Sequence, residues 1–345
     1  MKRILVAAAV VVMAGLAQAV PALAAQQCQP PPAGTVTVGS NPIDIVISQR
    51  QSRAYVANDG SVSVLSLVTH RQVAQVGTGF HDQTAIGLVR HDSEAYIGTF
   101  DLKELKVLNT GTLKLSGAVD VGLGATDVVA AKTKSGEYAY VTLLTSQAVA
   151  VVRTSDNKLV KTVRLPAGPQ TAQAAPGGRD IWVGSSYSGE IWVLSTATQR
   201  IARTISVSRS GPVSSIAFAP GGKQAWVYGL GGVSVIDVAT GGLLAFVPIT
   251  YLFPHSAAPN AGPIALTAGG DFALVVDSTF PDNPMRGTVA VLDTRTLRVL
   301  DRITTGTEPT GLAIDYARGT VYVTNYEDDT VSYFKAPCGS LANQR

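Results

Sequence analysis

Ionisable side chains suited to binding or proton transfer concentrate in a few connecting segments of this sequence. Two of the four histidines, His81 and His255, stand in such segments. Neutral imidazole and carboxylate are good ligands for zinc or iron, and histidine exchanges protons near neutral pH. The candidate binding residues are His81, Asp82, His255, Asp277, Asp282, Glu327, Asp328 and Asp329. Ligand binding, metal coordination and acid–base catalysis are therefore the chemistries to consider.

No familiar metal or cofactor motif contains these residues. The sequence lacks His-Glu-x-x-His, Gly-x-Ser-x-Gly, Cys-x-x-Cys and Cys-x-x-Cys-His, which mark zinc proteases, serine hydrolases, redox or metal sites and haem attachment. We therefore expect no cofactor and assign no catalytic residue. A divalent metal held by His81 and His255 stays open as an alternative, because the sequence does not tell whether their segments converge.

The elements that position these residues belong to an internal repeat. Seven copies of a short apolar segment begin with a large side chain, at spacings of 41, 44, 42, 44, 48 and 48 residues. The copies start at Tyr55, Tyr96, Tyr140, Trp182, Trp226, Leu274 and Tyr322. A period of 40 to 50 residues is typical of one four-stranded propeller blade. The sequence thus predicts an all-β, seven-bladed β-propeller.

Each unit contains four short strands around that anchor segment. The third and fourth strands alternate apolar and polar residues, as in 233–237 and 203–207, which indicates half-buried strands. The first strand, as in 216–219, is small and apolar, which suits a crowded position next to the channel axis. Trp182, Trp192 and Trp226 are expected to pack between blades, and Asp237 and Asp293 to stabilise turns.

The repeat resembles the YVTN-type β-propeller family. The resemblance rests on Tyr322-Val-Thr-Asn325, on Thr330-Val-Ser-Tyr333 and on Asn41-Pro42 and Glu308-Pro309 at unit starts. It implies a propeller related to surface-layer and periplasmic YncE-like proteins. Related propellers serve as binding proteins, redox-associated proteins, lactonases and lyases, so the resemblance implies the fold and no single activity.

The two ends of the repeat complement each other. The first strand-like segment, Thr35–Gly39, resembles a fourth strand, whereas the last unit ends after its third strand, near Lys335. We expect the first segment to complete the last blade, which also removes an exposed sheet edge. Cys28 and Cys338 flank these two strands, and exported proteins form disulfides readily. A Cys28–Cys338 disulfide is therefore predicted, with two unpaired or intermolecular thiols as the alternative.

The N-terminal residues have the features of an export signal. Met1-Lys2-Arg3, an apolar stretch and Ala22-Leu-Ala-Ala25 read as a secretory signal peptide. Loss of Lys2 and Arg3 lowers the formal charge from +3 to +1, and no basic cluster indicates nucleic acid. The expected segments are the signal, 1–25; a Pro-rich lead, 26–34; the propeller, 35–336; and a tail, 337–345. We expect a secreted or periplasmic monomer without a membrane span.

Unit six departs most from the regular repeat. Its first link, 251–263, and its second link, 278–287, are both longer than their counterparts, and both should emerge on one face at the channel mouth. Long insertions in a regular repeat often carry binding residues. The expected function is a non-catalytic scaffold that binds a protein or small molecule at the rim of blades 2, 6 and 7. The alternative is a hydrolase, lactonase or lyase that uses a rim His–Asp pair or a metal. Asp101 adds a nearby carboxylate. Asp44 and Asp127, at the starts of inner strands, could face the channel, but turn capping is the favoured role.

Overall fold

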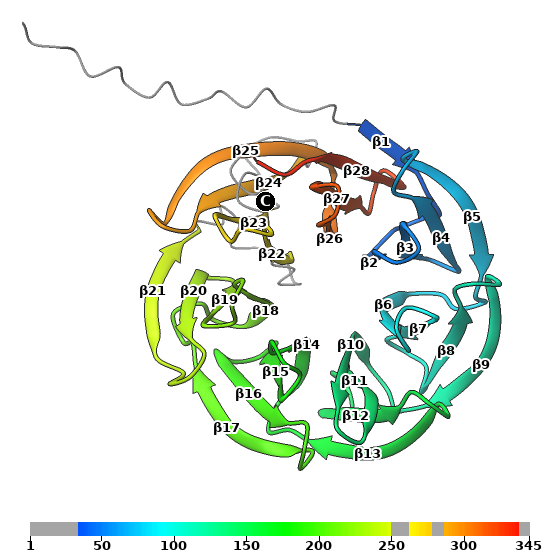
Figure 1. Cartoon of the computed structure of the whole chain (residues 1–345), viewed down its shortest axis with the longest axis horizontal. Helices are drawn as coiled ribbons and strands as arrows, with labels where there is room; N and C mark the ends of the chain where they lie inside the picture. Colours follow the sequence, from blue (N-terminus) through cyan, green and yellow to red (C-terminus); the bar gives the residue numbers. More distant parts are fainter. Residues whose placement is uncertain (1–33, 250–261, 278–285, 338–345) are drawn as a thin grey trace, which may run out of the picture. The chain divides into compact units, whose positions relative to one another are not determined.

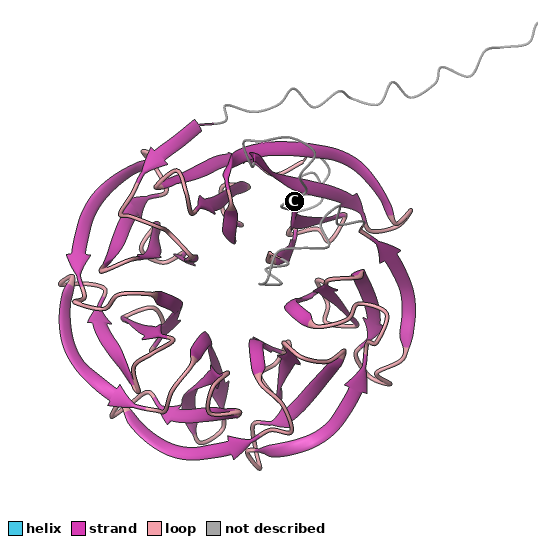
Figure 2. Ribbon diagram, turned by 180° about the vertical axis from the view of Figure 1, so that it is seen from behind, coloured by secondary structure: helices cyan, strands magenta, loops and turns pink. Residues whose placement is uncertain are grey.

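The computed structural model describes residues 34–249, 262–277 and 286–337. Within these ranges the chain forms strands and turns and no helix, and the strands make seven four-stranded antiparallel sheets. Figure 1 shows the sheets arranged as blades around a common axis, and Figure 2 shows the same ring from behind. The predicted seven-bladed propeller is confirmed.

Each blade runs from an inner strand at the channel to an outer strand. Blade 1 comprises β2 (Asp44–Ser48), β3 (Arg53–Asn58), β4 (Ser61–Ser66) and β5 (Arg71–Gly77). Blade 2 comprises β6 (Gln83–Val89), β7 (Glu94–Thr99), β8 (Glu104–Asn109) and β9 (Lys114–Asp120). Blade 3 comprises β10 (Ala125–Thr133), β11 (Gly136–Leu143), β12 (Ala148–Arg153) and β13 (Lys158–Arg164). Blade 4 comprises β14 (Pro169–Ala174), β15 (Asp180–Ser185), β16 (Glu190–Ser195) and β17 (Arg200–Ser206).

The remaining blades follow the same order until the last. Blade 5 comprises β18 (Val213–Phe218), β19 (Gln224–Gly229), β20 (Gly232–Asp237) and β21 (Leu243–Pro248). Blade 6 comprises β22 (Ile264–Leu266), β23 (Phe272–Asp277), β24 (Arg286–Asp293) and β25 (Arg298–Thr307). Blade 7 comprises β26 (Pro309–Asp315), β27 (Thr320–Asn325), β28 (Thr330–Lys335) and, as its outer strand, β1 (Gly34–Thr37).

The blades pack through apolar side chains that face the neighbouring sheet. Trp182 of blade 4, for example, lies in one buried cluster with Ile216 and Val227 of blade 5. Trp182, Trp192 and Trp226 are all fully buried, which confirms the expected packing. Since successive side chains of a strand point to opposite faces, each blade contributes to two such clusters and the core is continuous around the ring.

The anchor tyrosines also join blades through their hydroxyl groups. The Tyr55 hydroxyl of blade 1 lies 3.4 Å from the carbonyl oxygen of Thr110 in blade 2. The Tyr96 hydroxyl of blade 2 donates to Asn157 of blade 3, and the Tyr322 hydroxyl of blade 7 lies 2.9 Å from His70 Nδ1 of blade 1. These partners stand at or next to the turn between the third and fourth strands of the next blade. The large anchor residues therefore set both the spacing and the register of adjacent blades.

The N-terminal strand closes the ring as expected. β1 pairs antiparallel with β28, with Val36 opposite Val331 and Thr37 opposite Thr330. Val36 and Val38 are buried in a cluster with Leu65 and Leu67 of blade 1. The strand β1 ends at Thr37, two residues before the expected boundary, because the chain then turns toward β2. Cys28 and Cys338 lie outside the described residues, so their disulfide stays a prediction.

Two faces of the ring carry different connections. The rim face carries the links from each fourth strand to the next first strand and those between second and third strands. The turn face carries the turns between first and second and between third and fourth strands. No helix in the described ranges is long and apolar enough to cross a membrane.

Candidate functional site

Four carboxylates, a histidine and a tyrosine gather on the rim face. We call Asp59, His81, Asp82, Glu308, Tyr326 and Glu327 the rim cluster. Asp59 lies in a link of blade 1, and Tyr326 and Glu327 lie in a link of blade 7. His81 and Asp82 lie in the link from blade 1 to blade 2, and Glu308 lies in the link from blade 6 to blade 7. The rim cluster joins three of the predicted residues, His81, Asp82 and Glu327, to residues that sequence reasoning missed.

Asp59 links the parts of the cluster from blades 1 and 2. Its Oδ1 lies 3.2 Å from His81 Nδ1 and accepts a hydrogen bond of 3.1 Å from the Asp82 backbone N–H. Asp59 stands in the link 58–61, the counterpart in blade 1 of the link that contains Glu327. An alignment of the repeats would have pointed to this link, since both links carry acidic residues.

Tyr326 lies amid the carboxylates. Partial burial is the main cause that raises the pKa of its hydroxyl. The negative charges of Glu308, Glu327, Asp82 and Asp59 raise this pKa further. Burial likewise raises the pKa of Glu308, with a further contribution from Glu327. The charge of Glu327 therefore disfavours ionisation of both Glu308 and Tyr326. The site consequently favours a positively charged group that would relieve this repulsion.

Asp328 and Asp329 serve the loops around the cluster. Asp329 Oδ1 accepts a hydrogen bond of 2.8 Å from the Asn41 N–H, and Asp328 Oδ2 accepts one of 2.7 Å from the Thr307 N–H. Both carboxylates thus fix the links that lead into β2 and β26. Short polar side chains commonly cap turns in this way.

Gln83 positions the link that contains His81 and Asp82. Its side chain is fully buried, and its Nε2 donates to Thr78 Oγ1 at 2.8 Å and to the Ser61 carbonyl at 3.2 Å. Its Oε1 has no partner among the described residues. The same register position holds Ala125, Pro169, Val213 and Pro309 in other blades. Gln83 was not singled out from the sequence, although a polar residue at an apolar position of the repeat is a signal that could have identified it.

The histidine–aspartate pair is open to solvent. The side chain of His81 is 84% exposed and that of Asp59 is 39% exposed. No group of three or more His, Cys, Asp or Glu side chains within the described ranges is arranged to hold a metal ion. His255 and Asp282 lie outside the described residues, as does the side chain of Asp277, so the pairing of His81 with His255 stays untested. Asp101 lies on the rim face in the link between β7 and β8.

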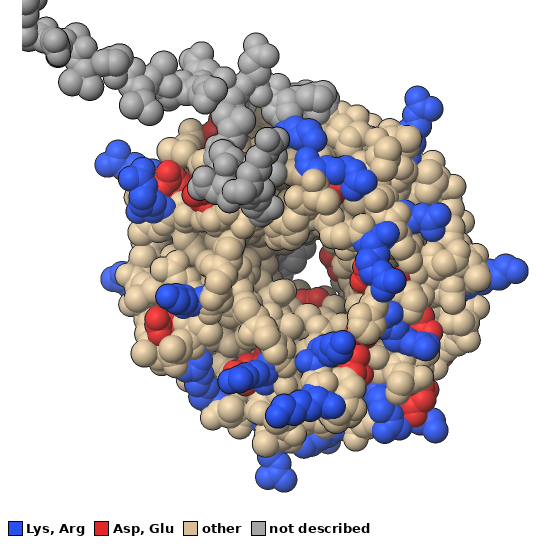
Figure 3. Space-filling view, viewed as in Figure 1, with Lys and Arg blue, Asp and Glu red and all other residues tan. Residues whose placement is uncertain are grey.

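Two aspartates lie at the channel. Asp44 Oδ2 accepts a hydrogen bond of 3.2 Å from the Ile86 N–H of blade 2, and Asp127 Oδ2 accepts one of 2.8 Å from the Ala172 N–H of blade 4. Figure 3 shows acidic atoms in the wall of the channel opening. Burial raises the pKa of Asp44. Burial, with a smaller contribution from the charge of Asp44, raises the pKa of Asp127 to about 7. Both side chains therefore connect the inner strands of neighbouring blades. Turn capping, which the sequence analysis favoured, is not their main role.

Comparison with known proteins identifies the fold. No family model matches the chain, and no curated protein is similar to it. The chain is similar to a solved structure described as Kuenenia stuttgartiensis Hydrazine Synthase, with a TM-score of 0.72 and 17% sequence identity. The match covers 86% of this chain and 96% of the other. At this identity the likeness establishes the propeller architecture alone.

Proposed function

We propose that this protein is an exported propeller that acts as a binding scaffold and recognises a positively charged group at the rim cluster. The carrying observation is the arrangement of Asp59, Asp82, Glu308 and Glu327 around Tyr326. Carboxylates attract cations, and a tyrosine ring adds a cation–π surface. A lysine- or arginine-bearing partner is the ligand of this kind that a wide, open rim suits best.

Solvent exposure favours binding over catalysis at this site. A general base works best within an enclosed site that tunes its pKa and excludes water, whereas His81 is mostly exposed. The alternative function is a hydrolase, lactonase or lyase, and the 3.2 Å contact between His81 and Asp59 is the observation that supports it. Export and membership of the YVTN-type family are part of the proposal; a mature N-terminus after Ala25 would support export.

A charge-matched pair of variants tests the rim cluster. A hexalysine peptide is titrated by calorimetry at low salt into the wild type and into a triple variant with Asp82→Asn, Glu308→Gln and Glu327→Gln. The control removes three rim-face charges elsewhere, by Asp101→Asn, Asp120→Asn and Glu190→Gln. We expect the cluster variant to bind at least about tenfold more weakly and the control within about twofold of the wild type.

Two results would contradict the proposal. Equal losses in both triple variants would show that only the net charge matters. A His81→Ala variant that binds the peptide normally but abolishes an ester- or lactone-hydrolysing activity of the wild type would favour the enzymatic alternative.

A further inference from the structure

A hollow of about 370 Å³ opens on the turn face at the channel edge of blade 6. It lies among the turns that join the first and second strands of blades 4 to 7, and Pro176, Pro220, Thr267 and Tyr316 line it, one from each turn. A hollow of this volume is large enough for a small organic ligand.

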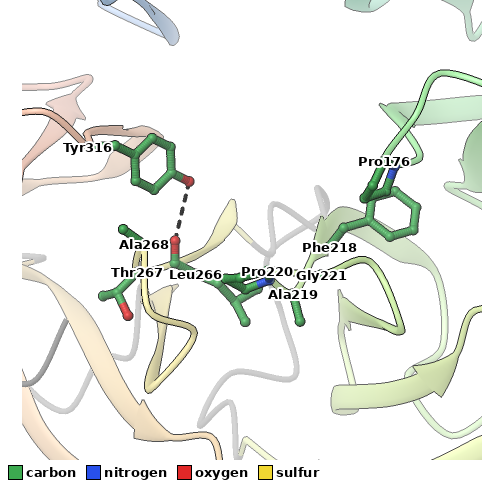
Figure 4. Close-up of a pocket in the computed structure, with 9 residues that line it drawn as sticks. All are labelled: Pro176, Phe218, Ala219, Pro220, Gly221, Leu266, Thr267, Ala268 and Tyr316. Atoms are coloured by element: carbon green, nitrogen blue, oxygen red, sulfur yellow. Dashed lines mark hydrogen bonds between the residues drawn. The ribbon is translucent and has the colours of Figure 1, made fainter. Parts of the chain in front are cut away.

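Aromatic side chains stand on opposite sides of the hollow. Figure 4 shows Phe218 and Pro176 on one side and Tyr316 on the other, with the turn of blade 6 between them. The Phe218 ring packs edge-on against Trp182, with ring centroids 5.3 Å apart. The Tyr316 hydroxyl donates to the Leu266 carbonyl at 3.2 Å. Both rings are therefore held in place by the protein, and the hollow is formed without a ligand.

Glycine turns keep the floor of the hollow apolar and open. Ala-Pro-Gly-Gly occurs at 175–178 and again at 219–222. A Cβ on Gly222 would lie 2.9 Å from Pro176, and one on Gly270 would lie 2.9 Å from Pro220. Only glycine allows these turns of neighbouring blades to stack so closely. The prolines then face the hollow without intervening side chains.

Positively charged residues follow several of the turns that line the hollow. Arg179 and Lys223 are exposed, follow two of the turns that line it, and have no ion pair among the described residues. Arg318 is paired with Asp315 at 3.1 Å, and Asp271 is the one exposed acid on the turn of blade 6. Lys and Arg side chains are prominent around the channel mouth in Figure 3. The surroundings thus favour an anionic group next to an apolar body.

We propose that this hollow, which we call the blade 6 hollow, is a second binding site and takes a small aromatic carboxylate. The aromatic body would lie between Phe218 and Tyr316, and the carboxylate would face Lys223 and Arg179. This site lies on the face opposite to the rim cluster and uses none of its residues.

Calorimetry with 4-phenylbutyrate and its cationic analogue 4-phenylbutylamine tests the proposal. We expect the wild type to bind the carboxylate at least about tenfold more tightly than the amine. Ala268→Trp, which fills the hollow, and Tyr316→Ala, which removes an exposed wall, should each weaken binding at least about tenfold. Lys223→Glu should weaken binding, whereas Lys134→Glu, the same change at the turn of blade 3, should not.

Three results would overturn the proposal that the blade 6 hollow binds an aromatic carboxylate. These are the absence of phenylbutyrate binding to the wild type, equal affinity for the amine, or full affinity in both Ala268→Trp and Tyr316→Ala. Circular dichroism melts confirm that each variant is folded. The triple rim-cluster variant should bind phenylbutyrate like the wild type, so failure of the rim proposal would leave this one standing.

Discussion

Aspartate occupies contrasting environments in this protein, and its role changes with them. Asp237 Oδ1 accepts hydrogen bonds from the Thr240 N–H at 2.7 Å and its hydroxyl at 2.8 Å, and these bonds lower the pKa of Asp237. Asp293 stabilises the corresponding turn of blade 6 in the same way. Both roles were predicted. Asp127 has a raised pKa instead, because it is surrounded by protein at the channel wall and lies near Asp44.

Asp127→Asn should become more stabilising, relative to the wild type, as the pH rises. Folding raises the pKa of Asp127 from 3.8 to about 7, so below about pH 4 the carboxyl is protonated in both states. Between pH 4 and 7 ionisation favours the unfolded chain, and wild-type stability falls. The difference in unfolding free energy, variant minus wild type, should rise by on the order of 1 to 3 kcal/mol between pH 4 and pH 8.

Urea denaturation at several pH values measures this difference. Asp237→Ala provides the opposite sign, since the lowered pKa of Asp237 stabilises the folded protein above the ordinary pKa and this contribution is lost in acid. A pH-independent difference for Asp127→Asn would show that its carboxyl does not titrate in this window.

At the scale of elements, the second strand of each blade does more than fill the core. Its anchor residue reaches the turn between the third and fourth strands of the next blade in blades 1, 2 and 7. The Tyr140 hydroxyl of blade 3, by contrast, is buried without a partner among the described residues. Blades 4 and 5 are joined by a different hydrogen bond, which Arg203 of blade 4 donates to the Ala239 carbonyl of blade 5 at 2.8 Å.

Replacing Tyr96 or Tyr140 by phenylalanine should show whether a hydroxyl that bonds to the next blade stabilises the fold more than one without a partner among the described residues. Tyr96→Phe leaves Asn157 without its donor and should lower the unfolding free energy by about 1 kcal/mol. Tyr140→Phe removes an unpartnered buried hydroxyl and should change the stability little or raise it. Urea denaturation of both variants provides the measurement; equal losses would mean that the hydroxyls do not act as inter-blade contacts.

At the scale of the whole molecule, stability depends on closure of the ring by β1. Val36 is buried against blade 1, whereas Thr35 of the same strand is exposed. Val36→Asp should lower the unfolding free energy by about 2 to 4 kcal/mol, because a charge enters the core, and Thr35→Asp by less than about 0.5 kcal/mol. Thermal melts compare the two. Similar effects of both changes would indicate that β1 does not pack into the ring.

Blade 6 makes the ring asymmetric. The sequence indicated this through its two long links on the rim face. The structure adds the short strand β22, which is shortened at its rim end, and, on the opposite face, the blade 6 hollow. Neither could be predicted from the repeat alone, because strand length at the channel depends on where pairing with β23 ends.

The sequence by itself determined the blade number, the strand order and the closure, because period and alternation are local properties that recur seven times. It also singled out His81, Asp82 and Glu327 by residue type, and their role in binding stays a prediction. Only the tertiary structure decided which carboxylates act on one group, since Asp59 and Glu308 are far apart in the chain and yet both influence Tyr326. Burial and Coulomb interactions depend on distances in space, and the raised pKa of Asp127 is therefore a property of the fold.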